Sequence, residues 1–167
     1  INQMKKNGIK VAFNPSSYHI RHAGKEILSS LKDVAFLVLN EGEAAELVGI
    51  PFSREKEVFK KLDKLMPGIV AVTNGRRGVT VSDGRNIYKA KIFKEKKIVD
   101  YTGAGDAFGS GFTAALMMGW DIKQAIRLGS ANATSVIEKI GATEGILTKK
   151  DFLNNRWKNL GIKIKFL

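Results

Sequence analysis

Apolar runs alternate with amphipathic stretches along the first half of the chain. Residues 34–39 and 69–73 are continuously apolar, as is typical of strands covered on both faces of a parallel sheet. Between them, residues 53–66 carry apolar side chains at helical spacing and end at Pro67-Gly68. This alternation predicts an α/β fold with a mostly parallel sheet and helices on both faces.

An antiparallel ribbon is expected at one edge of this sheet. The Asp83-Gly84 dipeptide is a hairpin signal between two short alternating segments. The expected strands are residues 9–13, 34–39, 69–73, 79–82, 86–90 and 162–166, with a strand end at 97–99. The expected helices are residues 25–31, 44–49, 53–66, 122–140 and 149–157, together with one that starts at Gly103–Gly105 and ends before Trp120.

The segment from Asp100 to Gly111 concentrates small residues, a hydroxyl and two carboxylates where a helix begins. At a helix N-terminus, free backbone N–H groups and the helix dipole favour an anion, and the glycines Gly103 and Gly105 let it approach the backbone. Asp106 lies in the first turn and could accept a proton from a hydroxyl that attacks a bound phosphate. The alternative is an aspartate that caps the helix after a glycine turn.

Polar residues also follow the strand at 34–39. Asn40 and Glu43 stand where open α/β sheets bind ligands, and could hold a hydrated magnesium ion and the phosphates that it bridges. The alternative is a capping turn, with Asn40 as the cap and Glu43 at its third position.

Two further segments could contact a nucleotide. Thr73, Gly75 and Gly78 could form a phosphate wall from a hydroxyl and exposed amides, although a tight turn needs the same glycines. Small residues around Asn132 make the helix at 122–140 narrow. A neighbouring helix that packs closely against these small residues would explain them. An adenine ring bound there would also explain them, and Asn132 would then face the nucleotide.

Composition narrows the function classes. The 167 residues, 44% apolar and 26% charged, are ordinary for one globular domain. The absence of cysteine excludes thiolate ligands, and with only His19 and His22 any metal is expected to be oxygen-liganded. The net charge of +12 suggests an anionic partner, but the lysines are dispersed without aromatic interleaving, so we expect no nucleic acid. No apolar run could span a membrane, which favours a cytoplasmic protein without a membrane partner.

Taken together, three motifs in a fixed order resemble the ribokinase-like (PfkB) carbohydrate kinases. Residues 99–108, Val-Asp-Tyr-Thr-Gly-Ala-Gly-Asp-Ala-Phe, look like the family's carboxyl-terminal signature. Asn40 to Glu43 looks like its Asn-x-x-Glu motif, and Thr73 to Gly78 like its Thr-x-Gly-x-x-Gly nucleotide segment. The resemblance runs from Ile9 to Leu147 and implies a three-layer, Rossmann-like fold.

The resemblance implies phosphoryl transfer from ATP to a hydroxyl of a sugar or nucleoside. Asp106 would be the catalytic base, beside an anion hole formed by Gly103, Ala104 and Gly105. Magnesium and phosphates would be organised by Asn40 and Glu43, the latter through water. The residues implied for the nucleotide pocket are Thr73, Gly75, Gly78 and Asn132, and those implied for a monovalent cation such as potassium are Asp100 and Thr102.

The family's members are about twice as long, and their amino-terminal half grips the sugar. Nothing here resembles that half, so we expect residues 1–167 to be a single nucleotide-binding domain, the carboxyl-terminal part of a longer kinase. The complete protein could be a homodimer. The alternative function is a nucleotide-binding or regulatory module without catalysis.

Overall fold

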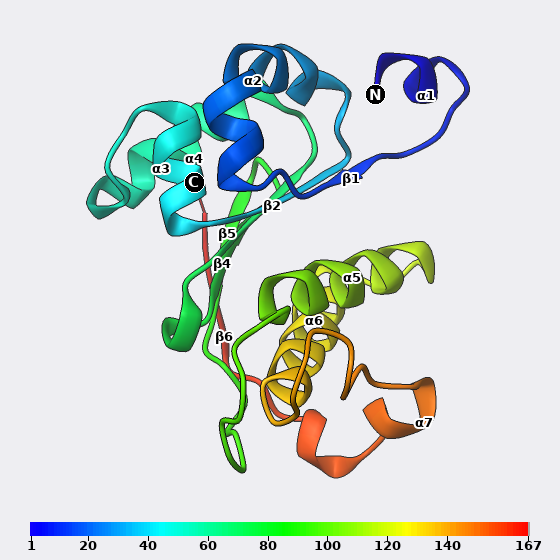
Figure 1. Ribbon diagram of the computed structural model, residues 1–167. Coiled ribbons are helices and arrows are strands. Elements are labelled where there is room, and N and C mark those ends of the chain that lie inside the picture. Colours follow the sequence, from blue (N-terminus) through cyan, green and yellow to red (C-terminus); the bar gives the residue numbers. More distant parts are fainter. Residues whose placement is uncertain (167) are drawn as a thin grey trace. The chain divides into compact units, whose positions relative to one another are not determined.

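A six-stranded mixed sheet confirms the α/β class (Figure 1). The computed structural model describes residues 1–166, and the strands follow one another in chain order across the sheet. β1, β2 and β3 run parallel, and β4 pairs antiparallel with β3. The strands are β1 (Ala12–Phe13), β2 (Phe36–Asn40), β3 (Ile69–Thr73), β4 (Val79–Ser82), β5 (Asn86–Ala90) and β6 (Ile162–Phe166).

Helices occupy most of the expected positions, with some different ends. The α-helices are α1 (Asn2–Lys6), α2 (Ser17–Ser30), α3 (Glu41–Val48), α4 (Glu55–Leu65), α5 (Ala104–Met117), α6 (Ile122–Val136) and α7 (Lys149–Phe152). Short 3-10 turns are η1 (Leu31–Asp33), η2 (Phe52–Arg54), η3 (Gly75–Arg77) and η4 (Asn155–Trp157). Within residues 1–166, no helix has both the length and the apolar character needed to cross a bilayer.

Two strand predictions need correction. The first strand is confined to Ala12–Phe13 rather than residues 9–13, and Ile9 is 54% exposed. Residues 97–99 are not a strand, because the Val99 amide donates to the carbonyl of Ile137 after α6 instead of to a sheet neighbour.

Side-chain caps account for two of the altered helix ends. α2 starts at Ser17 rather than Lys25, because Ser16 and His19 form a capping box; α2 then kinks at Ala23. The expected helix at 149–157 is instead α7 and η4, separated at Asn154, whose side chain accepts from the Arg156 amide.

The expected helix at 122–140 ends early. α6 stops at Val136, and Ile140 lies beyond it with 77% of its surface exposed. The apolar residue at 140 therefore continued the helical spacing in the sequence without belonging to the helix.

The chain divides into two compact units. Unit 1 contains residues 1–74, residues 79–88 and the end of the chain from Ile164. Unit 2 contains residues 75–78 and 89–163. The single nucleotide-binding domain stays a prediction.

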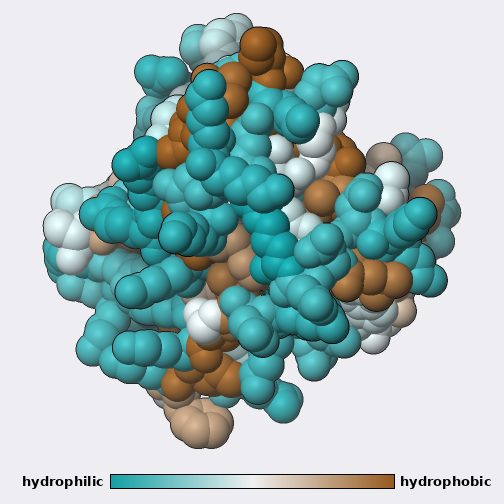
Figure 2. Space-filling view, turned by 90° about the horizontal axis from the view of Figure 1, so that it is seen from below, coloured by the Kyte–Doolittle hydropathy of each residue, from teal (hydrophilic) through white to brown (hydrophobic). Residues whose placement is uncertain are grey.

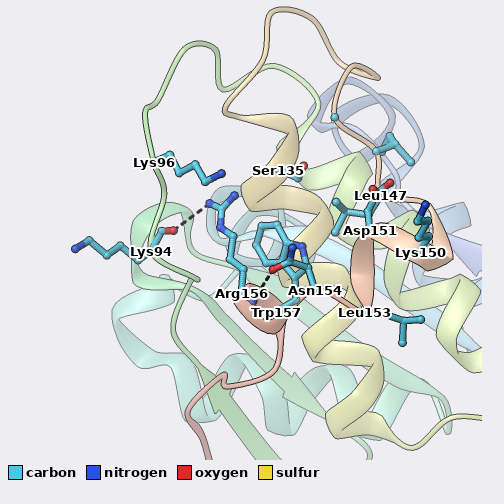
Figure 3. Close-up of a pocket in the computed structure, with 12 residues that line it drawn as sticks. Lys94, Lys96, Ser135, Leu147, Lys150, Asp151, Leu153, Asn154, Arg156 and Trp157 are labelled. Atoms are coloured by element: carbon cyan, nitrogen blue, oxygen red, sulfur yellow. Dashed lines mark hydrogen bonds between the residues drawn. The ribbon is translucent and has the colours of Figure 1, made fainter.

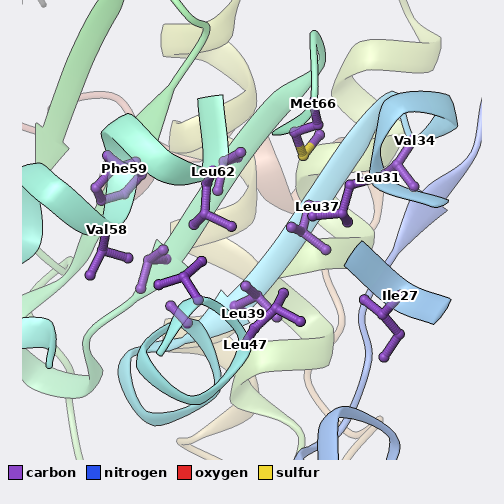
Figure 4. Packing of buried hydrophobic residues seen from close by; sticks show 14 of the residues in the cluster. Ile27, Leu31, Val34, Leu37, Leu39, Leu47, Val58, Phe59, Leu62 and Met66 are labelled. Carbon is purple, nitrogen blue, oxygen red and sulfur yellow. The ribbon is translucent and has the colours of Figure 1, made fainter. Parts of the chain in front are cut away.

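The core of unit 1 forms between its helices and one face of its strands. Leu37 and Leu39 from β2 pack with Phe59 and Leu62 from α4 and with Leu31 (Figure 4). All five side chains are almost completely buried, so each contributes about 1.5–3 kcal/mol by leaving water. This packing fixes the strand ends on which Asn40 and Thr73 lie.

Two glycines allow α5 and α6 to pack closely in unit 2. A Cβ on Gly129 would lie 2.8 Å from the carbonyl oxygen of Phe108, and one on Gly111 would lie 3.1 Å from the Cα of Gly129. Helix packing therefore accounts for the glycine at position 129 in the narrow part of α6.

Hydrophilic residues cover most of the face seen in Figure 2, with hydrophobic residues in separate places between them.

Candidate functional site

Asn40 and Thr73 are neighbours at the carboxyl ends of β2 and β3. They are register partners in the parallel ladder, and the Thr73 hydroxyl donates to the carbonyl of Leu39 at 3.3 Å. Parallel strands deliver their carboxyl ends to the same edge of a sheet, which is the usual ligand edge of α/β folds. The structure thus brings together two of the residues predicted from separate motifs.

Glu43 joins this edge through a capping box. Its amide donates to Asn40 Oδ1 at 2.8 Å, and its carboxylate accepts from the Asn40 amide at 2.9 Å. The second carboxylate oxygen lies 3.4 Å from the Ser17 hydroxyl. The capping interpretation is therefore confirmed, and the magnesium role of Asn40 and Glu43 stays a prediction.

Direct coordination of a metal by a carboxylate cluster is not supported. Among residues 1–166, no group of three or more His, Cys, Asp or Glu side chains could hold a metal ion. The oxygen donors of Asn40 and Glu43 suit magnesium, which keeps much of its water shell and is often contacted indirectly. The residues present therefore fit a water-mediated magnesium ion that also binds phosphates.

The turn after β3 belongs to unit 2 and needs a glycine. Gly78 has φ +98°, and a Cβ there would lie 2.0 Å from the carbonyl oxygen of Ala90. Gly75, in η3, has open space where a Cβ would be. Gly78 is thus explained by the turn itself, and the nucleotide role of both glycines stays a prediction.

Asp100 closes the turn that leads into α5. One carboxylate oxygen accepts from the amide and the hydroxyl of Thr102, at 2.9 and 2.7 Å. The other accepts from the Gly141 amide at 3.1 Å. These donors, the Thr102 amide foremost, lower the pKa of Asp100 below its ordinary value. Asp100 therefore ties the loop after α6 to the start of α5, and a monovalent cation here stays a prediction.

The start of α5 follows a glycine turn in which the Ala104 amide donates to the Tyr101 carbonyl at 3.3 Å, and the anion hole of Gly103, Ala104 and Gly105 stays a prediction. Gly103 is the N-cap, with φ +77°, and a Cβ there would lie 2.6 Å from the Cα of Ala142. Gly105 is helical, and a Cβ on it would meet nothing within 4 Å, so packing does not require a glycine there. The space beside the Gly105 backbone is open, and Asp106 is exposed on the same first turn. Backbone amides at such a turn lack helical partners and can bind an anion.

Asn132 lies inside unit 2. It is 5% exposed, and its Oδ1 accepts from the Leu147 amide at 2.9 Å. A Cβ on Gly111 would lie 2.9 Å from its Nδ2. Asn132 therefore holds the segment after α6 against that helix, and its contact with a nucleotide stays a prediction.

Sequence reasoning missed a contact between two of its own motifs. Arg76, in the turn after β3, donates from Nε to the Tyr101 hydroxyl at 3.1 Å. Both side chains are exposed, and Tyr101 precedes the amides of α5 by three residues. The signal that could have pointed to this contact was the guanidinium of Arg76, in a segment that the sequence analysis had already assigned to phosphate binding.

The chain matches the family model described as pfkB family carbohydrate kinase over residues 1–150. It is 36% identical over 154 residues to a ribokinase of Haemophilus influenzae, covering 89% of this chain and 48% of that protein. It is 31% identical over 147 residues to a cytidine kinase of Thermococcus kodakarensis, covering 84% of this chain and 51% of the relative. The chain thus spans about half the length of these curated relatives.

A solved structure agrees with these matches. The Arabidopsis thaliana ribokinase complexed with ribose and ATP aligns with a TM-score of 0.80 and 25% identity, over 95% of this chain and 50% of that one. The sheet described above is therefore the ribokinase-like sheet. With the family model matching most of its length, the chain belongs to the pfkB family of carbohydrate kinases.

Proposed function

We propose that the protein containing this chain transfers a phosphoryl group from ATP to a hydroxyl of a sugar or nucleoside. Family membership supports this proposal, as do relatives named ribokinase and cytidine kinase. This chain contributes the nucleotide-binding side of the site.

Asp106 is the general base in this proposal. It takes the proton of the acceptor hydroxyl, while the amides of Gly103, Ala104 and Gly105 stabilise charge on the transferring phosphoryl group. The observation that carries the proposal is the open space beside Gly105, with Asp106 exposed on the same turn. Phosphoryl transfer depends mainly on positioning and on such charge stabilisation.

Asn40, Glu43 and Thr73 serve the phosphates in the same proposal. Magnesium, when bound, neutralises charge on the phosphate oxygens, and Asn40 and Glu43 would hold it through water. The support is the shared strand edge, where Asn40 and Thr73 are register partners and the capping box orients Glu43. Gly75 would expose its backbone amide to the nucleotide. Gly78, whose amide donates to the Gly75 carbonyl at 3.1 Å, would shape the turn beside the nucleotide.

Asn132, Asp100 and Thr102 have supporting roles. Asn132 would shape the nucleotide pocket through the segment that begins at Leu147, to whose amide it is bonded. Asp100 and Thr102 would lie beside a potassium ion, and comparing turnover in potassium and sodium salts tests that role. Equal turnover in both salts would remove the ion from the proposal.

A second candidate function is a nucleotide-binding module without catalysis. Calorimetry with ATP and magnesium, followed by a phosphotransfer assay of this chain against a panel of sugars and nucleosides, separates the two functions. Binding without transfer supports the module, whereas transfer supports the kinase.

The base is tested in the intact protein with Asp106→Asn. We expect turnover to fall by about 10²–10⁴-fold, the usual contribution of a general base, with ATP affinity nearly unchanged. Asp121→Asn is the matched control, because Asp121 caps α6 at the other end of the α5–α6 pair. Unchanged turnover in Asp106→Asn would contradict the proposed base.

A further inference from the structure

The turn that leads into α5 is fastened to the segment that follows α6. The amides of Val99 and Asp100 both donate to the carbonyl of Ile137, at 2.8 and 3.3 Å. The Asp100 carboxylate accepts in return from the Gly141 amide, at 3.1 Å. These three hydrogen bonds hold the turn against the segment after α6 within unit 2.

Gly103 continues this contact at the start of the helix. A Cβ on it would lie 2.6 Å from the Cα of Ala142 and 2.7 Å from the Ala142 carbonyl oxygen, so the two backbones are in close contact. Its φ of +77° is a left-handed value, which lets the chain turn into α5 directly against that backbone. The direction of the amides at the start of α5 therefore depends on where the Ala142 backbone lies.

The far end of the same segment is anchored to α6. A Cβ on Gly145 would lie 2.6 Å from the carbonyl oxygen of Ser135, and the Leu147 amide donates to Asn132 at 2.9 Å. Ser135 and Leu147 are labelled in Figure 3, among the residues that line a depression of about 1000 Å³ in unit 2. The segment from Gly141 to Leu147 is thus held at both ends and gives the α5 turn a fixed support.

Asp100 joins the turn to this support through its side chain. The carboxylate oxygen that does not bind Gly141 accepts from the amide and the hydroxyl of Thr102, at 2.9 and 2.7 Å. Both oxygens are therefore bound to N–H or O–H donors, which come from two separate segments. An asparagine has one acceptor oxygen and one donor NH₂ group, so it could keep the bonds to Thr102 or the bond to Gly141, but not both.

The charge of Asp100 by itself acts against a phosphate. A carboxylate three residues before Gly103 repels an anion at the start of α5, so removing the charge would by itself strengthen anion binding. Losing the bond to Gly141 acts in the opposite direction, because the turn is freed from its support and its amides are no longer preorganised. The two effects have opposite signs, so one substitution distinguishes them.

We propose that Asp100 is a positioning residue of the anion hole. It does not touch the phosphoryl group; it holds the Gly103 turn against Gly141 and Ala142, and so fixes the direction of the amides at the start of α5. This inference rests on the phosphoryl-transfer function proposed for Gly103, Ala104 and Gly105. It gives Asp100 a role that does not require a monovalent cation.

ADP with magnesium and aluminium fluoride is the probe, because the metal fluoride takes the place of the transferring phosphoryl group. Calorimetry on the intact protein should show that Asp100→Asn and Asp100→Ala each weaken aluminium fluoride binding by at least about tenfold, with the affinity for ADP alone changed by less than about threefold. Unchanged or stronger aluminium fluoride binding in Asp100→Asn would overturn the inference. If the unaltered protein binds no aluminium fluoride, the proposed anion hole fails, and the inference fails with it.

Hydrogen exchange measures the support directly. In Asp100→Ala the amides of Thr102 and Gly141 both lose their acceptor, so exchange at Gly141 should accelerate by at least about tenfold. The amides in the middle of α6 should stay as protected as in the unaltered protein. Unchanged exchange at Gly141 would contradict the contact on which the inference depends.

A matched substitution and a change of salt complete the test. Asp121→Asn makes the same change in the carboxylate that caps α6, where an asparagine can still accept from the Gln124 amide, and should leave aluminium fluoride binding within about twofold. The loss in Asp100→Asn should be equal in potassium and sodium salts. A loss seen only in potassium, or an equal loss in Asp121→Asn, would overturn the inference, and circular dichroism checks that each variant is folded.

Discussion

The Nε of Arg76 and the hydroxyl of Tyr101 are 3.1 Å apart and hydrogen-bonded. The pair joins the turn after β3 to the turn before α5, two segments of unit 2 separated by 25 positions in sequence. Because the two side chains are exposed, water can replace either partner, and the net energy of the bond is expected to be small.

A double-mutant cycle with Arg76→Ala and Tyr101→Phe should detect this bond. We expect a coupling energy of about 0.5–1 kcal/mol in urea unfolding, because each single change removes the same hydrogen bond. The matched pair Arg85→Ala with Tyr101→Phe should show additivity, since Arg85 lies in the β4–β5 turn and has no contact with Tyr101 in the described hydrogen bonds. Additive effects in the Arg76 pair would mean that the bond does not persist in solution.

Gly78→Ala should destabilise the chain far more than Gly84→Ala. Both glycines have positive φ, at +98° and +79°, so each substitution incurs a backbone cost of about 1–2 kcal/mol. Only at Gly78 would the new Cβ also lie 2.0 Å from the carbonyl oxygen of Ala90; at Gly84 it meets open space. Thermal unfolding of the two variants measures the difference. Equal losses would show that the turn after β3 can move away from Ala90.

Local pattern was enough to predict several strands of this fold. Residues 69–73, 79–82, 86–90 and 162–166 are strands with the predicted bounds, because alternation, apolar runs and the Asp83-Gly84 turn are read within a few residues. Ile9 was misjudged because its apolar neighbours resemble a strand, while the ladder with β2 begins only at Ala12. The spacing of apolar residues within a segment does not show whether another strand lies beside it.

For the candidate site too, local patterns could be predicted from the sequence, whereas contacts between distant segments could not. The capping box of Asn40 and Glu43 was predictable, because both partners lie within one helical turn. The Arg76–Tyr101 and Asn132–Leu147 contacts were not predicted, since each joins residues brought together by the fold rather than by spacing. The sequence therefore identified the segments of the site but not the bonds between them.

Asn132→Ala should loosen the segment that follows α6. The change removes the acceptor of the Leu147 amide and leaves that amide without its partner, at an expected cost of about 1–3 kcal/mol. Hydrogen exchange should accelerate at Leu147 more than at the amides in the middle of α6. Asn132→Asp is the matched control for the bond, because it keeps an acceptor oxygen at the same place and should protect Leu147 better than alanine does. Unchanged exchange at Leu147 in Asn132→Ala would contradict this role.

Acid should weaken unit 2 through Glu138. Burial alone would raise the pKa of Glu138, but the hydrogen bonds from Arg156 and the Lys96 amide outweigh it and lower the pKa below the ordinary value of 4.5. A carboxylate with a lowered pKa stabilises the folded state above its unfolded pKa, and this contribution is lost as the pH falls through the folded pKa.

We therefore compare the unfolding free energies of the unaltered chain and Glu138→Gln. Their difference should be largest at neutral pH and should shrink below pH 4.5. Urea unfolding from pH 7 to pH 3 measures this difference. Glu26→Gln is the control, because Glu26 is exposed and its difference should stay small throughout. A Glu138 difference that is constant across this range would contradict the lowered pKa, and with it the charged Glu138–Arg156 pair.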